Sequence, residues 1–439
     1  MLLHHSALEP VTPNRITLGL DLGTSGIRAA VVQPDGEVIA RSRLDWPHGI
    51  MPDAPEEWWL HARNVLREAI EKAGTVHIDA VAVDGTSGTV LWCADDGQPL
   101  TPAFGYDQPV AADSIQRIAA IAPAASGAHG SGSGLARALQ LAHPGLPANA
   151  RLRTQTDWIT GCLLGDWRQG DENNALKLGY DPVDRSWPDW LSAIPVPRSA
   201  LARCHPPGAD LGAMAPQVAA TLGVPGSCRI VAGTTDSIAG TLAAGIRAEG
   251  DAVTSLGTTL ALKLLTSRAV FAPEYGIYSH RLGLRFLAGG ASNCGAGILS
   301  RFFSADRLAS LSRQIDADRD SGLDYYPLLR PGERFPRNDP DLQPRLTPRP
   351  ESDVHFLHGL LEGIARVEAE GYRRLHELGA TWPRRVLSVG GGADNPAWLR
   401  IRGRYLQVPV QAAADGEAAV GAARLAQGRL RDGDVGVAP

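Results

Sequence analysis

Residues 18–32 read LGLDLGTSGIRAAVV and residues 252–265 read AVTSLGTTLALKLL, so one short phrase occurs twice in the chain. In each copy, an apolar run is followed by Leu-Gly-Thr-Ser or Leu-Gly-Thr-Thr and then by a second apolar run. A Gly-Thr turn between two β-rich runs predicts a tight hairpin. The backbone N–H groups and hydroxyls of such a turn converge on one point, which suits a phosphate. The two copies therefore indicate two related domains that grip one polyphosphate.

Length and composition set the frame for this interpretation. A chain of 439 residues is longer than a domain with a single hydrophobic core usually is, which favours two domains. The net charge of −5 offers no basic face to nucleic acid or to an anionic membrane. The five cysteines never form a Cys-x-x-Cys pair, which favours a reducing compartment and argues against a disulfide framework or a zinc site.

The amino-terminal residues predict no export signal. Residues 1–14 lack a sustained apolar stretch, and we expect a disordered leader. No run reaches the ~18–20 apolar residues that span a bilayer. We therefore expect a cytoplasmic protein, either a monomer or a homodimer.

Short apolar strands and amphipathic helices alternate in both halves, which predicts an α/β fold. Helical spacing covers residues 56–73 and 353–378, and buried-type strands cover residues 77–84 and 385–389. The second hairpin phrase begins just after residues 245–250, where we place the domain boundary.

Two segments carry no clear period. Residues 203–226 are rich in Pro and Gly and are expected to be irregular. Residues 324–350 are rich in Pro and charged side chains and are expected to form a long surface loop, either a lid or a decoration.

Two aspartates are candidates for chemistry. Asp21 lies in the first hairpin phrase, where a carboxylate would repel phosphate unless Mg²⁺ lay between them; the alternative is an Asp that caps its own turn. Asp236 follows an apolar strand and begins a helix of small residues. It is either a plain helix N-cap or the general base for a substrate hydroxyl, and one residue can do both.

The run 390–398 reads GGGADNPAW and leads from a strand into a helix. Glycines let a ligand approach the backbone closely, Asn395 offers amide hydrogen bonds, and Trp398 offers a stacking face for a purine. The alternative is a tight turn with a core tryptophan. No Gly-x-x-x-x-Gly-Lys-Ser/Thr sequence and no protein-kinase motif set occurs, so those two kinase classes are excluded.

In order along the chain, DLGTSG, AVDGTSGTVL, DENN, AGTTDSIAG, SLGTT and GGGADNPAW resemble the FGGY family of carbohydrate kinases, over roughly residues 15–430. The resemblance implies two ribonuclease-H-like domains of the actin-like ATPase type, with ATP and a sugar in the cleft between them. It implies a first domain over residues 15–245, a second over 246–430 and a tail over 431–439. It also implies ATP-dependent phosphorylation of a sugar hydroxyl, with Mg²⁺, by closure of the cleft.

The resemblance also assigns roles to single residues. Asp236 matches the catalytic base and a substrate contact, and Asp21 matches the carboxylate near Mg²⁺ and the sugar. The remaining assignments are Gly23, Thr24 and Ser25 in the first phosphate hairpin, with Thr24 also near the substrate, Gly257, Thr258 and Thr259 in the second hairpin, and Gly391, Gly392, Asn395 and Trp398 around adenosine.

The substrate is harder to assign. Typical bacterial xylulokinases carry Gln-Met-His after the second strand, whereas residues 87–91 here read SGTVL. Their Trp-Asn-Asp-x-Arg stretch is reduced to GYDQP at residues 105–109. The chain is more similar to the short plant and cyanobacterial group associated with D-ribulose kinase, which implies that Ser87 contacts the sugar. We expect D-ribulose as substrate, with xylulose or another ketose or polyol as the alternative. A remote alternative is a non-catalytic ATP-binding sugar sensor.

Overall fold

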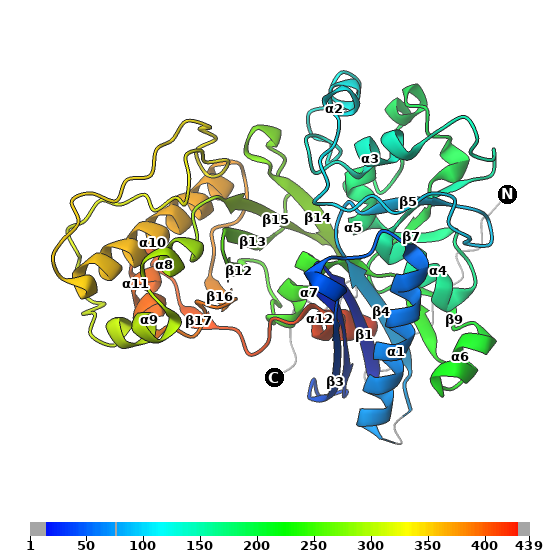
Figure 1. The fold of residues 1–439 in the computed structure, drawn as a ribbon, viewed down its shortest axis with the longest axis horizontal. Helices are drawn as coiled ribbons and strands as arrows, with labels where there is room; N and C mark the ends of the chain where they lie inside the picture. The colour runs from blue at the N-terminus through cyan, green and yellow to red at the C-terminus, as the bar shows by residue number, and fades with distance from the viewer. Residues whose placement is uncertain (1–14, 75–76, 429–439) are drawn as a thin grey trace.

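The structure, a computed structural model, describes residues 15–74 and 77–428, so the expected leader and tail lie outside the described residues. Figure 1 shows two lobes, each built on its own sheet. The first sheet has the order β3-β2-β1-β4-β10-β9, with β11 also paired to β4. Its strands are β1 (Thr17–Gly23), β2 (Gly26–Val32), β3 (Val38–Asp45), β4 (Ala80–Gly85), β9 (Asp210–Ala213), β10 (Arg229–Val231) and β11 (Thr234–Thr235).

Helices and two small sheets complete the first lobe. The small sheets pair β5 (Val90–Cys93) with β6 (Arg151–Thr154), and β7 (Gln169–Asp171) with β8 (Arg203–His205). The α-helices of this part are α1 (Pro55–Ala73), α2 (Ala112–Ala119), α3 (Gly134–Leu141), α4 (Gln155–Leu164), α5 (Glu172–Ala175), α6 (Pro216–Leu222) and α7 (Asp236–Ala243). Short 3-10 turns lie at Pro47–Gly49, Leu176–Leu178, Asp189–Ala193 and Arg198–Ala200.

The second sheet has the order β14-β15-β13-β12-β16-β17. Its strands are β12 (Asp251–Leu256), β13 (Leu260–Thr266), β14 (Tyr278–Leu282), β15 (Arg285–Ser292), β16 (Arg385–Val389) and β17 (Val410–Ala412). The helices that follow β12 in the chain are α8 (Gly297–Phe302), α9 (Ala305–Ser312), α10 (Asp353–Glu377), α11 (Pro396–Leu406) and α12 (Ala418–Ala426), with a 3-10 turn at Pro273–Tyr275. Both predicted hairpins form: β1 with β2, and β12 with β13, are antiparallel pairs.

Alternation along the strands gives each sheet two covered faces. In β1, Leu18, Leu20 and Leu22 pack with side chains of α1 and α4. On the opposite face α12 lies so close that a Cβ at Gly19 would come within 1.9 Å of the Ala419 carbonyl oxygen. The glycine is therefore required by the approach of α12 to the sheet.

Helices α7 and α12 lie between the two sheets (Figure 1). Ile238 and Leu242 of α7 share an apolar cluster with Val253 and Leu265 of the second sheet. Helix α12 packs on α7 and on the first sheet, although it comes last in the described chain. Helix α12 lies within the range 246–430 expected for the second domain, yet it packs against the first sheet.

The other face of the second sheet packs against α10 and α11 in a core that contains a buried polar network. Arg402 of α11 and Glu368 of α10 are both fully buried and form a two-pronged ion pair, with N···O distances of 2.6 and 2.7 Å. Arg402 also donates to the Ser388 hydroxyl at 2.6 Å. This network fixes both helices to the strand β16.

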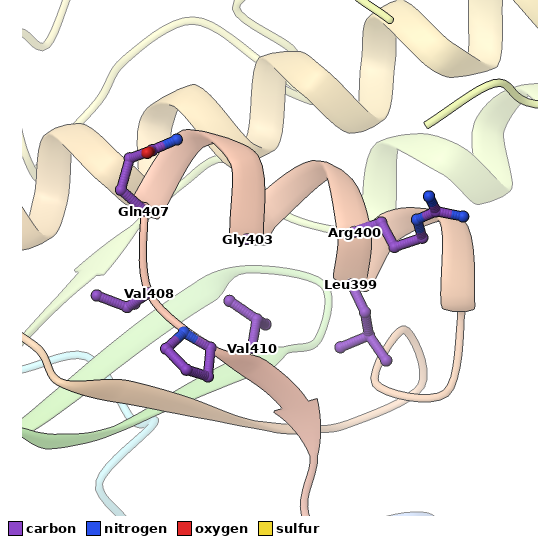
Figure 2. A pocket seen from close by; sticks show the side chains of 7 residues that line it. Leu399, Arg400, Gly403, Gln407, Val408 and Val410 are labelled. Atoms are coloured by element: carbon purple, nitrogen blue, oxygen red, sulfur yellow. The ribbon is translucent and has the colours of Figure 1, made fainter. Parts of the chain in front are cut away.

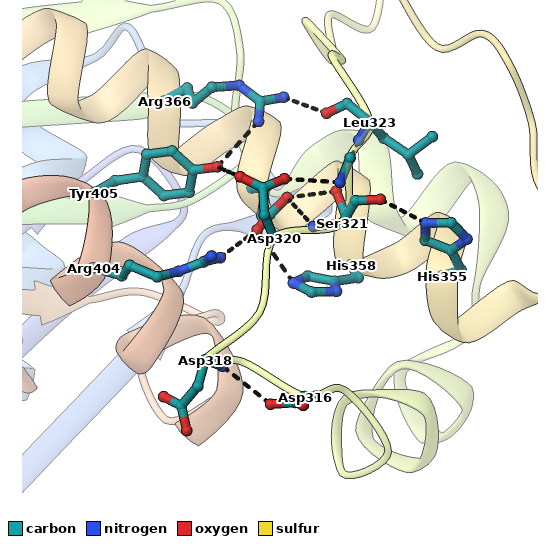
Figure 3. Close-up of polar contacts among 12 residues, drawn as sticks. Asp316, Asp318, Asp320, Ser321, Leu323, His355, His358, Arg366, Arg404 and Tyr405 are labelled. Carbon is teal, nitrogen blue, oxygen red and sulfur yellow. Dashed lines mark hydrogen bonds and ion pairs between the residues drawn. The ribbon is translucent and has the colours of Figure 1, made fainter.

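The segment after α9 is held to α10 and α11 by further polar contacts (Figure 3). Glu362 of α10 accepts a hydrogen bond from the Ser321 backbone N–H at 3.0 Å and pairs with Arg404 of α11. Burial favours the neutral acid, but hydrogen bonds from His358, Ser321 and Arg404 lower the pKa of Glu362 to about 2.

One organisational prediction was wrong. Residues 203–226 contain β8, β9 and α6 and are not irregular throughout. Residues 324–350 do lack helices and strands, with only isolated β-bridges such as the one between Tyr326 and Arg345.

Candidate active site

Three aspartates gather at one edge of the first sheet. Asp21 of β1 is the register partner of Asp84 in the parallel strand β4. Thr234 of β11 is the partner of Asp84 on its other side, and Asp236 follows two residues later as the first residue of α7. Because these parallel strands end at the same edge, their carboxylates meet where a ligand is expected to bind in an open α/β sheet.

Burial strongly perturbs the first two carboxyl groups. Asp21 is 4% exposed, and burial, followed by the negative charge of Asp236, raises its pKa to about 6. Asp84 is fully buried; its pKa is raised well above the ordinary range by burial and then by Asp21. Two adjacent buried carboxylates cannot both ionise easily, so this pair holds a proton, and Asp84 is the protonated partner. Sequence reasoning missed Asp84, a single acid within an apolar strand.

The first hairpin turn is fixed by a second residue that sequence reasoning missed. Arg28 of β2 lies 3.2 Å from the Asp21 carboxylate and donates to the Ser25 hydroxyl at 2.9 Å. The Thr24 hydroxyl lies 2.8 Å from the Tyr106 hydroxyl, and both Thr24 and Ser25 are exposed. The predicted phosphate turn is therefore accessible and carries a cation.

Asp236 occupies the first helical position of α7, after the N-cap residue Thr235. One of its carboxylate oxygens accepts the Ser237 backbone N–H at 2.7 Å. Burial raises the pKa of Asp236, against this hydrogen bond and the positive charges of Lys177 and Lys263. A base with a raised pKa beside the other acids suits proton abstraction.

The turn after β4 carries Ser87. The Thr86 hydroxyl donates to the Gln155 side-chain oxygen at 2.8 Å, and Lys177 donates to the Ser87 backbone oxygen at 2.9 Å. The turn is thus held from two sides, while the hydroxyl of Ser87 is buried without a partner.

Several residues on or near these elements carry buried polar atoms without a partner. Buried donors and acceptors are almost always paired in folded proteins, so a group of unpaired ones marks a place where a ligand completes the bonding. Among the described residues, they include Asp21 Oδ1, both oxygens of Asp84, Ser87 Oγ, Asn173 Oδ1, Asn174 Oδ1, Thr235 Oγ1 and both ring nitrogens of His280.

The second hairpin turn faces solvent as the first does. Thr258 and Thr259 are exposed, and the Gly257 carbonyl accepts the Ala296 backbone N–H at 2.8 Å. A Cβ at Gly295 would lie 2.5 Å from the Thr258 carbonyl oxygen, so the loop before α8 packs directly under the turn.

The Gly-rich turn before α11 divides into accessible and structural residues. Gly391 is exposed with open space around its Cβ position. Both ends of the Asn395 amide are engaged, since it accepts the Trp398 backbone N–H at 3.2 Å and donates to the Ser312 hydroxyl at 2.9 Å. Trp398 is 1% exposed in the core, and a Cβ at Gly392 would lie 2.4 Å from its ring. The structure supports the core alternative for Trp398 and offers no indole face to adenine.

The side chains at this site could supply some of the ligands of a Mg²⁺ ion but not all of them. No group of three or more His, Cys, Asp or Glu side chains in the described part of the chain could hold a metal ion. Asp21 Oδ1 is unpaired beside the accessible hairpin turn. The ion fits there if phosphate oxygens and waters supply its other ligands, which is the environment Mg²⁺ prefers.

One cavity lies away from the carboxylates. A cavity of about 450 Å³ opens between α11 and β17 (Figure 2) and is lined by Leu399, Gly403, Gln407 and Val410, among others.

Within residues 15–74 and 77–428, no helix is long and apolar enough to cross a membrane.

Comparison with known proteins identifies the family. Residues 16–243 match the N-terminal domain model of the FGGY family of carbohydrate kinases, and residues 252–427 match its C-terminal domain model. Xylulose kinase of Escherichia coli K12 is 24% identical, over 93% of this chain and 89% of that protein. Autoinducer-2 kinase of the same strain is 23% identical, over 90% and 82%.

Solved structures give the same result. Xylulose kinase from Rhodospirillum rubrum superposes with a TM-score of 0.80 at 25% identity, over 94% of this chain and 89% of that one. Plasmodium falciparum glycerol kinase superposes with a TM-score of 0.81 at 16% identity, over 95% and 90%. The two sheet-containing lobes thus match the actin-like ATPase fold, and the chain belongs to the FGGY family of carbohydrate kinases.

Proposed function

We propose that this protein transfers the γ-phosphoryl group of ATP to the terminal hydroxyl of a ketopentose, D-ribulose in the first place. The observation that carries the proposal is the group of buried, unpaired polar atoms around Asp21, Asp84 and Asp236. A sugar has many hydroxyls that donate and accept, so it can complete these bonds without bringing a charge into the protein.

Asp236 acts as the general base in this proposal. The sugar oxygen forms a bond to the γ-phosphorus, the bond to the bridging oxygen breaks with its electron pair leaving on ADP, and Asp236 takes the hydroxyl proton. When bound, Mg²⁺ neutralises charge on the phosphate oxygens. The two hairpin turns position the phosphates, and Arg28 supplies a fixed positive charge beside the first turn.

The choice of D-ribulose rests on the turn after β4. Ser87 has a buried, unpaired hydroxyl there, in place of the Met-His pair of typical xylulokinases. D-xylulose is the second candidate, because xylulose kinases are among the relatives over most of the chain. The two sugars differ only in the configuration of one hydroxyl, so one hydrogen-bonding position decides between them.

The test is a coupled ADP-release assay with ATP·Mg²⁺ and a panel of D-ribulose, D-xylulose, L-ribulose, ribitol, glycerol and no sugar. We expect the highest kcat/KM with D-ribulose. We also expect Asp236→Asn to lose at least about 100-fold in kcat, while the exposed control Asp113→Asn keeps its activity. Preference for another sugar would refute the assignment from Ser87. Release that does not depend on sugar would indicate an ATPase, and no release would favour a sensor.

A further inference from the structure

Lysine is rare in this chain, and two of its three lysines act on Asp236. It occurs at three positions only, Lys72, Lys177 and Lys263, although lysine and arginine together number 42. Lys177 and Lys263 come from different domains, and the charges of both act on Asp236. Lysine is a compact point charge on a flexible stem, unlike the planar fork of arginine.

The register of the second sheet places Lys263 beside Tyr278. Lys263 of β13 pairs with Gly289 of β15, and Gly289 pairs in turn with Tyr278 of β14, so the three residues form one row. A Cβ at Gly289 would lie 2.7 Å from the Lys263 Cδ atom. The glycine therefore leaves room for the lysine stem to lie across β15 towards the tyrosine.

This row faces the first domain. Leu262 and Leu264, the neighbours of Lys263 in β13, point into the core under α10. Leu265, two residues beyond Lys263, packs against α7. Because side chains alternate along a strand, Lys263 lies on the same face as Leu265, towards the helix that begins at Asp236.

Lys177 meets this row from the first domain. Its ammonium group donates to the Ser87 backbone oxygen at 2.9 Å and interacts with the Tyr278 hydroxyl. The charge of Lys177 has the largest effect on the pKa of Tyr278 and lowers it. Burial raises this pKa, the charge of Lys263 lowers it, and the net effect is a lowered pKa. The charges of two lysines from two domains thus act on the predicted base, and the Tyr278 phenol lies beside both lysines.

Neither lysine has a full ionic partner. Within the described chain, the ammonium groups of Lys177 and Lys263 form no ion pair with a carboxylate, whereas Lys72 pairs with Glu68 at 2.7 Å. Burial lowers the pKa of Lys263, and the charges of Tyr278 and Asp236 offset this only in part. Neutral sugar hydroxyls would not offset these two positive charges, whereas a phosphoryl group would.

We propose that Lys177 and Lys263 bind the phosphoryl group as it passes from ATP to the sugar, so that the second domain contributes a catalytic residue beyond its hairpin turn. The inference rests on the proposed kinase reaction. The bonds change as described above, and the ammonium groups stay protonated while they donate hydrogen bonds to the non-bridging phosphoryl oxygens. Their charge offsets the negative charge that both the phosphoryl group and Asp236 bring to one place.

The variants Lys177→Met and Lys263→Met test this, because methionine keeps most of the apolar stem and removes the charge. Lys72→Met, which removes an exposed lysine of α1, is the matched control. With the preferred sugar of the panel, we expect Lys177→Met and Lys263→Met each to lose about 100-fold in kcat. For Lys263→Met the KM for the sugar should change less than about threefold, because Lys177 and not Lys263 holds the Ser87 turn, and the control should match the unaltered protein. A raised sugar KM with unchanged kcat would mean that the lysines bind the sugar and would overturn the proposal.

A second measurement does not depend on which sugar is used. Orthovanadate mimics a transferring phosphoryl group, so it should tighten ADP·Mg²⁺ binding to the unaltered protein in calorimetry and fail to do so for Lys263→Met. Equal tightening in both would overturn the proposal, even if no panel sugar were phosphorylated. If Lys263→Met does not fold, as judged by its thermal midpoint, Lys263→Arg takes its place. Arginine keeps the charge but not the shape, and we expect a partial loss of kcat with vanadate tightening retained.

Discussion

Replacing Asp21 by asparagine should stabilise the protein in a pH-dependent way while abolishing activity. Burial and the charge of Asp236 raise the pKa of Asp21 from 3.8 to about 6. The folded chain therefore holds this proton more tightly than the unfolded chain does. The stability that follows is fully present below pH 3.8 and is lost as the pH rises through about 6.

The magnitude follows from the two pKa values. Relative to a side chain that never ionises, the raised pKa of Asp21 lowers the free energy of unfolding by about 1.6 kcal/mol near pH 5 and about 3 kcal/mol near pH 8. Asparagine carries no charge at either pH, and its amide can still bond to Asp84. The gain in stability of Asp21→Asn over the unaltered protein should therefore be about 1.4 kcal/mol larger at the higher pH.

Urea unfolding at the two pH values, followed by tryptophan fluorescence, measures this difference. The exposed residue Asp113 supplies the control Asp113→Asn, for which we expect no change with pH in this comparison. An Asp21→Asn gain that is the same at both pH values would refute the argument, because it would show that Asp21 keeps an ordinary pKa in the folded protein.

Two further predictions concern the second domain. Arg402→Met should destabilise the protein by about 3–5 kcal/mol in urea unfolding, because it leaves the buried charge of Glu368 without its ion pair. Adding Glu368→Gln should restore part of the loss, and a double variant as unstable as the single one would contradict this. Trp398→Ala should cost about 3–5 kcal/mol of stability through the cavity it leaves, with the KM for ATP unchanged in the folded protein. A large rise in the KM for ATP with normal stability would show instead that Trp398 contributes to the adenine site.

The parts of the fold that the sequence predicted are those with local causes. The two hairpins follow from turn residues between apolar runs, and α1 ends at Gly74, where φ is +79°. Strands β8 and β9 were missed because each is short and lies in a segment rich in Pro and Gly. They become strands by pairing with β7 and β10, partners that no local pattern reveals.

The position of α12 could not be predicted for a related reason. Its sequence, AAVGAARLA, consists mostly of small apolar residues and does not indicate which sheet it covers. Its place in the chain, after the strands of the second sheet, predicts the second sheet. The signals that decide the matter are distant in sequence. Gly19 admits the helix to the first sheet, and a Cβ at Gly421 would meet the Ala239 carbonyl oxygen of α7 at 1.7 Å. Close helix packing thus depends on pairs of small residues whose meaning appears only when both are seen together.

The same contrast holds within the candidate site. Asp21 could be proposed because it comes just before a recognisable turn, and Asp236 because it follows a short strand and begins a helix. Asp84 and Lys263 could not, because their roles arise from register: parallel pairing sets Asp84 beside Asp21, and Gly289 connects Lys263 to Tyr278. Each is the single charged residue of its strand, AVAVDG in β4 and LALKLLT in β13. Burying such a group is costly, so its presence there implies compensation. For Asp84 that compensation is a proton shared with its neighbour, and for Lys263 we infer that it is the phosphoryl group.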